Sequence, residues 1–336
     1  MLPVGLWGGQ ARGSLSSKYL PSFCCSVMKA NTEQALRGQY DGLSAVIMTA
    51  FCDTLKCLME NWRAALPELK IIPIVYAQNR KSPSGQAYMR EEFARVKARL
   101  EELCGVTITD EALWQAAEVY DDWREAMQRF VALTPAYPQI FTPAVRHLVI
   151  KAAFYMDKKV YTRKLLALMD ALPPPAERPA GLRRVILTGL MSEPPELLEL
   201  LEDLGYQVVG DDLAQESRQF RTASDRRLPP LERMAERLSR MDGCSFLYDE
   251  NKLRGAMLLE QVRQTGAEAV IFCQMKFCDP EEFDYAILKR EFQQAGVPLL
   301  QLELEQQMDS MEQLRTRLQS MAEILEANGG VTVACT

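Results

Sequence analysis

Residues 45–53 read Ala-Val-Ile-Met-Thr-Ala-Phe-Cys-Asp, and residues 269–279 read Ala-Val-Ile-Phe-Cys-Gln-Met-Lys-Phe-Cys-Asp. Each segment has an apolar run typical of a buried strand, then the triplet Phe-Cys-Asp, then a helical pattern. This order predicts that Cys52 and Cys278 lie where a parallel strand ends and a helix begins. Ligands bind at this edge of open α/β sheets. Two thiols in matched positions can therefore meet at one site between two α/β units.

The overall composition limits the classes of partner. The chain has 336 residues, 48% hydrophobic and 25% charged, which suits a soluble globular protein of two or three domains. Its net charge of −6 and the lack of a basic stripe argue against nucleic-acid binding. No apolar run approaches the ~20 residues that span a bilayer, and the N-terminus has no export-signal pattern. We therefore expect a cytoplasmic protein with no nucleic acid and no membrane as partner.

Nine cysteines and a single histidine restrict the kinds of site that this chain can build. The odd cysteine count and the expected reducing compartment favour metal binding or catalysis over disulfides. One histidine, His147, excludes sites with several histidine ligands and argues against a histidine-based catalytic triad. We expect His147 to have a structural or surface role in a helix. A metal site must rest mainly on sulfur, which selects zinc, copper(I) or iron–sulfur clusters.

The succession of strands and helices predicts three domains. Residues 1–82 alternate strands with a helix and form the expected N-terminal α/β domain. Residues 83–180 lack strand signals and are expected to form a helical subdomain that ends in a proline-rich linker. Residues 181–336 return to α/β alternation. The predicted fold class is therefore α/β, with two doubly wound parallel-sheet domains and an intervening helical subdomain.

Individual elements are expected from periodicity and from helix start and stop signals. The strands are expected at residues 3–7, 45–51, 71–76, 185–189, 206–209, 269–272 and 297–302. The helices are expected at residues 54–66, 90–103, 109–130, 154–172, 197–204, 230–241, 252–266, 281–295 and 308–327. Asp53 and Asp279 are the expected N-caps of two of these helices, and Pro280 suits the first turn.

Cys52 and Cys278 are the first candidates for a thiolate site. A thiolate at a helix N-terminus is stabilised by the helix dipole and by free N–H groups, and an anionic iron–sulfur cluster gains from the same groups. The alternative is that each is a small buried residue at a strand end. The pair Cys24-Cys25 precedes a helical stretch and could supply a third thiolate from one of its two members.

The other cysteines are expected to have structural roles. The spacing of Cys57 and Cys273 from the two Phe-Cys-Asp triplets does not match the knuckles of zinc sites. We expect Cys57 on the inner face of its helix and Cys273 within the sheet. Cys104, Cys244 and Cys335 are expected to be packing residues.

Two groups of charged residues are also candidates for ligand contacts. Asp211-Asp212 follows an expected strand, where a carboxylate could meet a ligand, but a solvated loop is the favoured interpretation. A polar stretch further on could face an anionic substrate or a partner, but a solvated surface is favoured there. Its arginines are Arg218, Arg221, Arg226 and Arg227.

Four segments carry a resemblance to a known family. They are residues 25–29 (Cys-Ser-Val-Met-Lys), 51–56 (Phe-Cys-Asp-Thr-Leu-Lys), 210–218 (Gly-Asp-Asp-Leu-Ala-Gln-Glu-Ser-Arg) and 275–285 (Met-Lys-Phe-Cys-Asp-Pro-Glu-Glu-Phe-Asp-Tyr). Together they resemble the 2-hydroxyacyl-CoA dehydratase family, which includes benzoyl-CoA reductase subunits, and most closely its β-type (D-component) subunit. The resemblance extends over nearly the whole chain.

The resemblance implies a [4Fe-4S] cluster between the two α/β domains, held by three cysteines. Carried over residue by residue, these are Cys25 and Cys52 in the first expected domain and Cys278 in the third. Cys25 is preferred over Cys24 because it stands four residues before Lys29, as in the family pattern. One iron is left without a protein thiolate, and its ligand stays open.

The resemblance also implies an activity and partners. The family works as a heterodimer of related subunits, and a separate ATP-hydrolysing iron–sulfur activator injects one electron. That electron converts the thioester carbonyl of a 2-hydroxyacyl-CoA into a ketyl radical anion, from which the hydroxyl leaves to give an enoyl-CoA. The implied enzyme is a hydro-lyase. The partner subunit is expected to bind most of the substrate, so no catalytic acid or base is assigned to this chain.

Other functions remain open at this point. Within the family, the runner-up is a subunit of a benzoyl-CoA-reductase-like or double-cubane-cluster reductase. From another class, the alternative is a cluster-free α/β binding protein with buried cysteines. The acyl group of the substrate is also left open.

The N-terminal region departs from the family pattern. Members usually carry a strand and a loop with a Pro-Glu-Glu-like motif before the segment that corresponds to Leu2-Pro3-Val4-Gly5. That stretch is absent, and the first α/β domain is short. We therefore expect an N-terminally truncated chain, through a late start codon or a degenerate gene copy.

Overall fold

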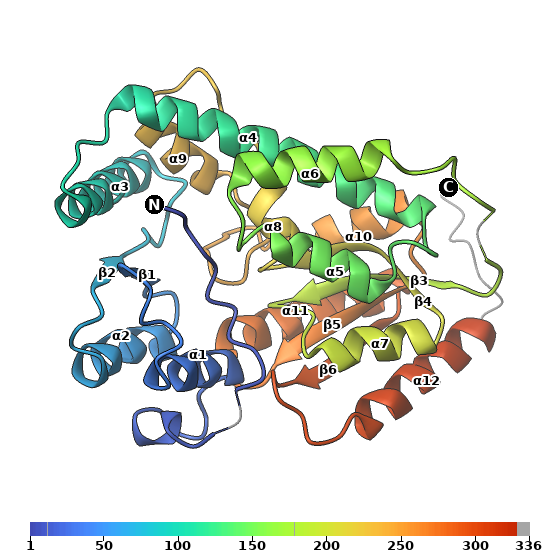
Figure 1. Cartoon of the computed structure of the whole chain (residues 1–336). Coiled ribbons are helices and arrows are strands. Elements are labelled where there is room, and N and C mark those ends of the chain that lie inside the picture. Colours follow the sequence, from blue (N-terminus) through green and yellow to red (C-terminus); the bar gives the residue numbers. More distant parts are fainter. Residues whose placement is uncertain (12, 178, 328–336) are drawn as a thin grey trace.

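The computed structural model of the chain describes residues 1–11, 13–177 and 179–327 and contains two parallel sheets (Figure 1). The smaller sheet pairs β1 (Val46–Thr49) with β2 (Ile71–Ile74). The larger sheet has four strands in the order β4-β3-β5-β6. These are β3 (Arg183–Gly189), β4 (Tyr206–Leu213), β5 (Ala269–Met275) and β6 (Leu299–Leu304). The prediction of an α/β fold with parallel sheets is confirmed.

Helices cover both faces of the four-stranded sheet, because side chains alternate along each strand. Val185 packs in a core with α7 (Pro195–Asp203) and α12 (Glu312–Ala327). Its neighbour Ile186 packs on the other side with α10 (Arg254–Thr265) and α11 (Asp279–Ala295). The chain therefore leaves β3 toward one face and leaves β5 toward the other. This divergence makes the carboxyl ends of β3 and β5 a topological switch point, where such sheets bind ligands.

The smaller sheet packs against α1 (Ser26–Leu36) and α2 (Asp53–Ala65) around Trp62. The predicted strand at residues 3–7 is wrong, because this segment is extended but pairs with no sheet. It is fixed instead by Trp7, whose carbonyl accepts a hydrogen bond from Gln306 and whose ring is buried. A buried tryptophan in an apolar run imitates the strand pattern in the sequence.

Between β2 of the smaller sheet and β3 of the larger sheet, the described chain is helical. The chain continues through α3 (Pro83–Cys104), α4 (Asp110–Leu133), α5 (Pro143–Ala152) and α6 (Lys158–Asp170). Four further helical elements complete the described part of the fold: η1 (Ser16–Lys18), η2 (Thr134–Ala136), α8 (Ser217–Phe220) and α9 (Pro230–Ser239). The helix predicted at residues 154–172 starts later, because Asp157 caps α6 by accepting the N–H of Val160.

The described part of the chain has no helix that is long and apolar enough to cross a membrane. The three-domain division at residues 82 and 180 stays a prediction. The first sheet has two described strands, so its doubly wound form stays a prediction as well.

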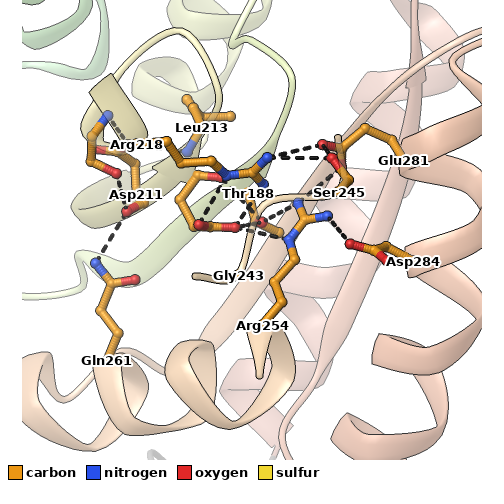
Figure 2. A network of polar contacts seen from close by, with 12 residues as sticks. Thr188, Asp211, Leu213, Arg218, Gly243, Ser245, Arg254, Gln261, Glu281 and Asp284 are labelled. Atoms are coloured by element: carbon orange, nitrogen blue, oxygen red, sulfur yellow. Dashed lines mark hydrogen bonds and ion pairs between the residues drawn. The ribbon is translucent and has the colours of Figure 1, made fainter. Parts of the chain in front are cut away.

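A buried network of ion pairs connects β4 with the first turn of α11 (Figure 2). Asp212 accepts from Arg218 and Arg254 at 2.8 and 2.9 Å. Glu281 accepts from the same two arginines at 3.2 and 2.9 Å, and Ser245 donates to it at 2.6 Å. Burial opposes the charge of Asp212, but the guanidinium groups outweigh this effect and hold its pKa well below the usual range. The network therefore holds two carboxylates and two guanidinium groups charged inside the protein.

This network corrects two predictions from the sequence. Asp211 and Asp212 are buried within β4, which continues to Leu213, and do not lie in a solvated loop. Arg218 is buried instead of solvated, and Arg221 pairs with Asp212. Arg226 and Arg227 are exposed, as predicted; Arg226 also pairs with carboxylates of α4. Burial of these charges is tolerated because each has an opposite charge within hydrogen-bond distance.

A second buried network surrounds His147 in α5. Its Nδ1 lies 2.8 Å from Glu216 and 3.0 Å from the hydroxyl of Ser192. Burial opposes the charged imidazole, but contacts with Glu193 and Glu216 outweigh it and raise the pKa of His147 to about 9. His147 therefore has a structural role in a helix, which is one of the two roles expected from the sequence.

Stability should depend on pH through His147. A group whose pKa is raised on folding stabilises fully below its unfolded pKa, near 6.5, and this stabilisation is lost as pH rises through about 9. The free energy of unfolding in urea should therefore fall between these pH values, by an amount on the order of 3 kcal/mol. His147→Gln should remove this part of the fall, because glutamine has no group that titrates between these pH values. An unchanged slope in the variant would contradict the assignment.

Loss of one carboxylate from the first network should be strongly destabilising. Glu281→Ala removes one buried counter-charge from both Arg218 and Arg254, so we expect a loss of about 3–5 kcal/mol in urea unfolding. Glu282→Ala is the matched control, because this neighbouring carboxylate is exposed in the same helical turn and should cost less than about 0.5 kcal/mol. Equal effects of the two substitutions would show that the network does not stabilise the fold.

Candidate functional site

Three cysteines stand directly before helices, as their N-caps. Cys25 caps α1, Cys52 caps α2 and Cys278 caps α11. The predictions that Asp53 and Asp279 are the N-caps are wrong by one residue, because each aspartate is already the first helical residue. The free N–H groups of the three first turns therefore face sulfur atoms instead of carboxylates.

One cavity of about 680 Å³ is lined by Cys25, Cys52 and Cys278. They come from three distant segments: the start of α1, the end of β1 and the end of β5. Phe277 adopts a left-handed backbone conformation with φ of 62°, which is strained for a non-glycine residue, and the chain turns there before Cys278 enters the cavity. Pro280 is in the first turn of α11, as predicted.

Backbone N–H groups at the helix starts contact all three sulfurs. The sulfur of Cys25 is approached by the N–H groups of Val27 and Met28, and that of Cys278 by the N–H of Glu281. Cys52 is approached in the same way by two N–H groups from the first turn of α2. Such groups favour an anionic sulfur. Three helix starts therefore point their positive dipole ends into one cavity.

The three thiols nevertheless resist ionisation in the absence of a cation. Burial raises the pKa of all three, to about 11 for Cys25. Mutual repulsion contributes as well, because the charge of Cys52 opposes that of Cys25, and both oppose that of Cys278. Coordinated metal ions would remove this obstacle, since a thiol that binds a metal is deprotonated.

The three cavity cysteines offer soft sulfur donors to a metal centre. Within the described ranges, no set of three or more His, Cys, Asp or Glu side chains is arranged to hold one metal ion. The ligands of a cubane bind separate irons at its corners, so their sulfurs lie farther apart than those around one zinc ion. Three soft donors, one shared cavity and converging N–H groups are what an anionic iron–sulfur cluster requires.

Three other cysteines lie close to this region. Cys24 is buried beside Thr54 in the core of the smaller sheet and does not line the cavity. Cys273 is buried within β5, as predicted. Cys244 lines the cavity, although the sequence suggested only a packing role.

The predictions for Cys57 and Cys104 are wrong, and that for Cys335 is untested. Cys57 is exposed, because the inner face of α2 is formed by Leu58 and Trp62. Cys104 is exposed at the end of α3 and does not pack. Cys335 lies outside the described residues.

Sequence reasoning also missed one wall of the cavity, formed by two helices. The contributing residues of α4 are Leu113, Ala116, Ala117, Tyr120, Asp121 and Arg124. Those of α9 are Pro230, Arg233, Met234, Arg237 and Leu238. Both sets repeat at intervals of three and four, so each helix turns one continuous face to the cavity. This spacing is visible in the sequence, but it does not distinguish a cavity wall from a core.

Comparisons with known proteins agree with this geometry. Residues 1–325 match the model of the family described as 2-hydroxyglutaryl-CoA dehydratase, D-component. The chain is 40% identical over 325 residues to the (R)-phenyllactyl-CoA dehydratase beta subunit of Clostridium sporogenes, covering 97% of this chain and 87% of the relative. It is 41% identical over 326 residues to the lactoyl-CoA dehydratase subunit beta of Anaerotignum propionicum, covering 96% and 86%.

A third relative is the (R)-2-hydroxyglutaryl-CoA dehydratase, subunit beta, of Acidaminococcus fermentans. It is 32% identical over 334 residues, which cover 97% of this chain and 87% of the relative. These matches confirm the resemblance seen in the four sequence segments. The chain therefore belongs to the 2-hydroxyglutaryl-CoA dehydratase D-component family.

Proposed function

We propose that this chain is the β-type subunit of a 2-hydroxyacyl-CoA dehydratase, a hydro-lyase that forms an enoyl-CoA. The observation that carries the proposal is the set of three N-cap cysteines in one cavity. The comparisons support the proposal, because three relatives of similar length are named as beta subunits of such dehydratases. A subunit of this kind works with a homologous second subunit and an ATP-dependent iron–sulfur activator, under anaerobic conditions.

Cys25, Cys52 and Cys278 are the proposed ligands of a [4Fe-4S] cluster between the two α/β parts of the chain. When bound, such a cluster accepts and donates one electron at a time. The chain contributes three thiolates, the N–H groups that stabilise negative charge, and burial that limits access of water. Cys25 is the proposed ligand in preference to Cys24, because only Cys25 lines the cavity.

The need for an electron follows from the substrate. The β-proton of a 2-hydroxyacyl thioester is poorly acidic, so ordinary acid–base elimination of water is unfavourable. One-electron reduction of the thioester carbonyl gives a ketyl radical anion and makes loss of the neighbouring hydroxyl possible. The cavity supports the proposal that this chain holds the cluster. We assign no catalytic acid or base to this chain. The substrate binds mainly to the partner subunit in this proposal.

Iron content should depend on the cavity cysteines. After anaerobic purification and reconstitution, the chain should contain about four irons and four sulfides, with the absorbance of an iron–sulfur cluster. Cys52→Ala and Cys278→Ala should each lose most of the iron. Cys57→Ala is the matched control, because Cys57 is exposed on the same helix that Cys52 caps and should keep the cluster. A colourless reconstituted protein would favour a cluster-free binding protein instead.

The two adjacent cysteines should behave differently. Cys25→Ala should lower the iron content as strongly as Cys52→Ala does, because it removes a sulfur from the cavity. Cys24→Ala should keep the iron and reduce stability by about 1 kcal/mol, since it removes a small buried side chain from the core. The reverse pattern would assign the ligand to Cys24.

A further inference from the structure

The helical wall of the cavity contains two arginines with too little negative charge around them. Arg237 donates to the backbone carbonyls of Thr222 and Gln219 at 3.0 and 2.7 Å. Across the described ranges it makes no ion pair with a carboxylate within 4.0 Å. Arg124 lies close enough for its charge to disfavour that of Arg237. The two guanidinium groups thus share one region of the wall.

Arg124 has only a shared counter-charge. Its single ion pair among the described residues is with Asp121. Asp121 also pairs with Arg233 and accepts from the hydroxyl of Ser224, so its charge is divided. The Nε of Arg124 is buried and has no hydrogen-bond partner among the described residues. An unused donor therefore remains on a side chain that lines the cavity.

Arg124 and Arg237 carry like charges, and burial makes both charges costly. Burial lowers the pKa of Arg124 to about 10, and burial together with the charge of Arg124 lowers the pKa of Arg237 to about 9. Arginine keeps its proton in proteins, so both groups remain cationic at neutral pH. An anion placed between the two guanidinium groups would offset their repulsion.

We propose that this wall binds the carboxylate of a small free organic acid, with Arg124 and Arg237 as its cationic partners. Planar guanidinium groups match the two oxygens of a carboxylate. The same cavity is lined by apolar side chains such as Leu113, Ala117 and Met234, so it suits an acid with a hydrocarbon body better than inorganic phosphate. A cavity of about 680 Å³ has the size of a small-molecule site.

The proposed acid-binding site uses no cysteine. None of its groups is a proposed cluster ligand, so binding can be measured whether or not the cluster is loaded. Failure of this inference would leave the proposed dehydratase function intact, because iron content tests that function independently.

Isothermal titration calorimetry on the full chain tests the inference, with phenyllactate as the probe. Phenyllactate should bind the wild-type chain and raise its thermal unfolding midpoint. Phenyllactamide has the same body without the charge and should bind at least about tenfold more weakly. Inorganic phosphate should also bind at least about tenfold more weakly than phenyllactate, because it lacks an apolar body.

Substitutions locate the site. Arg124→Gln and Arg237→Gln should each weaken phenyllactate binding at least about tenfold, since each removes a charge-assisted hydrogen bond. Arg237→Lys keeps the charge and should retain more affinity than Arg237→Gln. Arg129→Gln is the matched control: Arg129 is exposed on α4 outside the cavity lining, and its loss should leave binding unchanged.

Several results would overturn the inference. One is the absence of phenyllactate binding to the wild-type chain, a measurement that needs no variant to fold. Others are equal binding of phenyllactamide, stronger binding of phosphate, or wild-type affinity in both glutamine variants. Circular dichroism and iron content of each variant should match those of the wild type, so that loss of binding is not loss of the fold.

Discussion

The ion pairs of Asp212 and Glu281 with Arg218 and Arg254 fix the position of Cys278. Glu281 lies in the first turn of α11, three residues after the cysteine, and its N–H donates to the carbonyl of Cys278 at 3.0 Å. The arginines come from α8 and α10, so the network connects three helices to the end of β4 (Figure 2). A buried charge network tolerates little displacement, because any separated ion would be left unpaired at low dielectric. The sulfur of Cys278 is thereby oriented by contacts within the protein.

The sequence was informative wherever local pattern and local structure agree. Apolar runs followed by a capping position gave the strand ends and helix starts at Cys52 and Cys278, because both features depend on neighbours in the chain. Prediction from sequence failed for Arg218 and Asp212, because the type of a charged residue does not show which residue it pairs with. Arg218 pairs with Glu281, 63 residues further on, and only the folded sheet brings them together. A polar stretch of sequence can therefore be predicted as solvated although its charged side chains are buried and paired in the folded protein.

The cavity wall was missed for a different reason. Arg124 and Arg237 lie on two helices, α4 and α9, that are far apart in the sequence, and each helix shows an ordinary amphipathic pattern. Whether such a face covers a core or a cavity depends on how closely its partner approaches, which the periodicity does not contain. The third cysteine illustrates the same limit. Cys24 and Cys25 are neighbours with similar burial, and only the orientation of the chain at the start of α1 separates a packing residue from one that lines the cavity.

The charges around the cavity suit the proposed electron transfer better than they would suit proton transfer. The single histidine is held in another network by Glu216 and Glu193, and it does not line the cavity. Of the two aspartates in the described lining, Asp121 is held by arginines and by Ser224. What faces the cysteines is instead a set of helix N–H groups, which stabilise added negative charge without exchanging a proton. In the proposed function, such surroundings would let a bound redox group change its charge with little rearrangement of the protein.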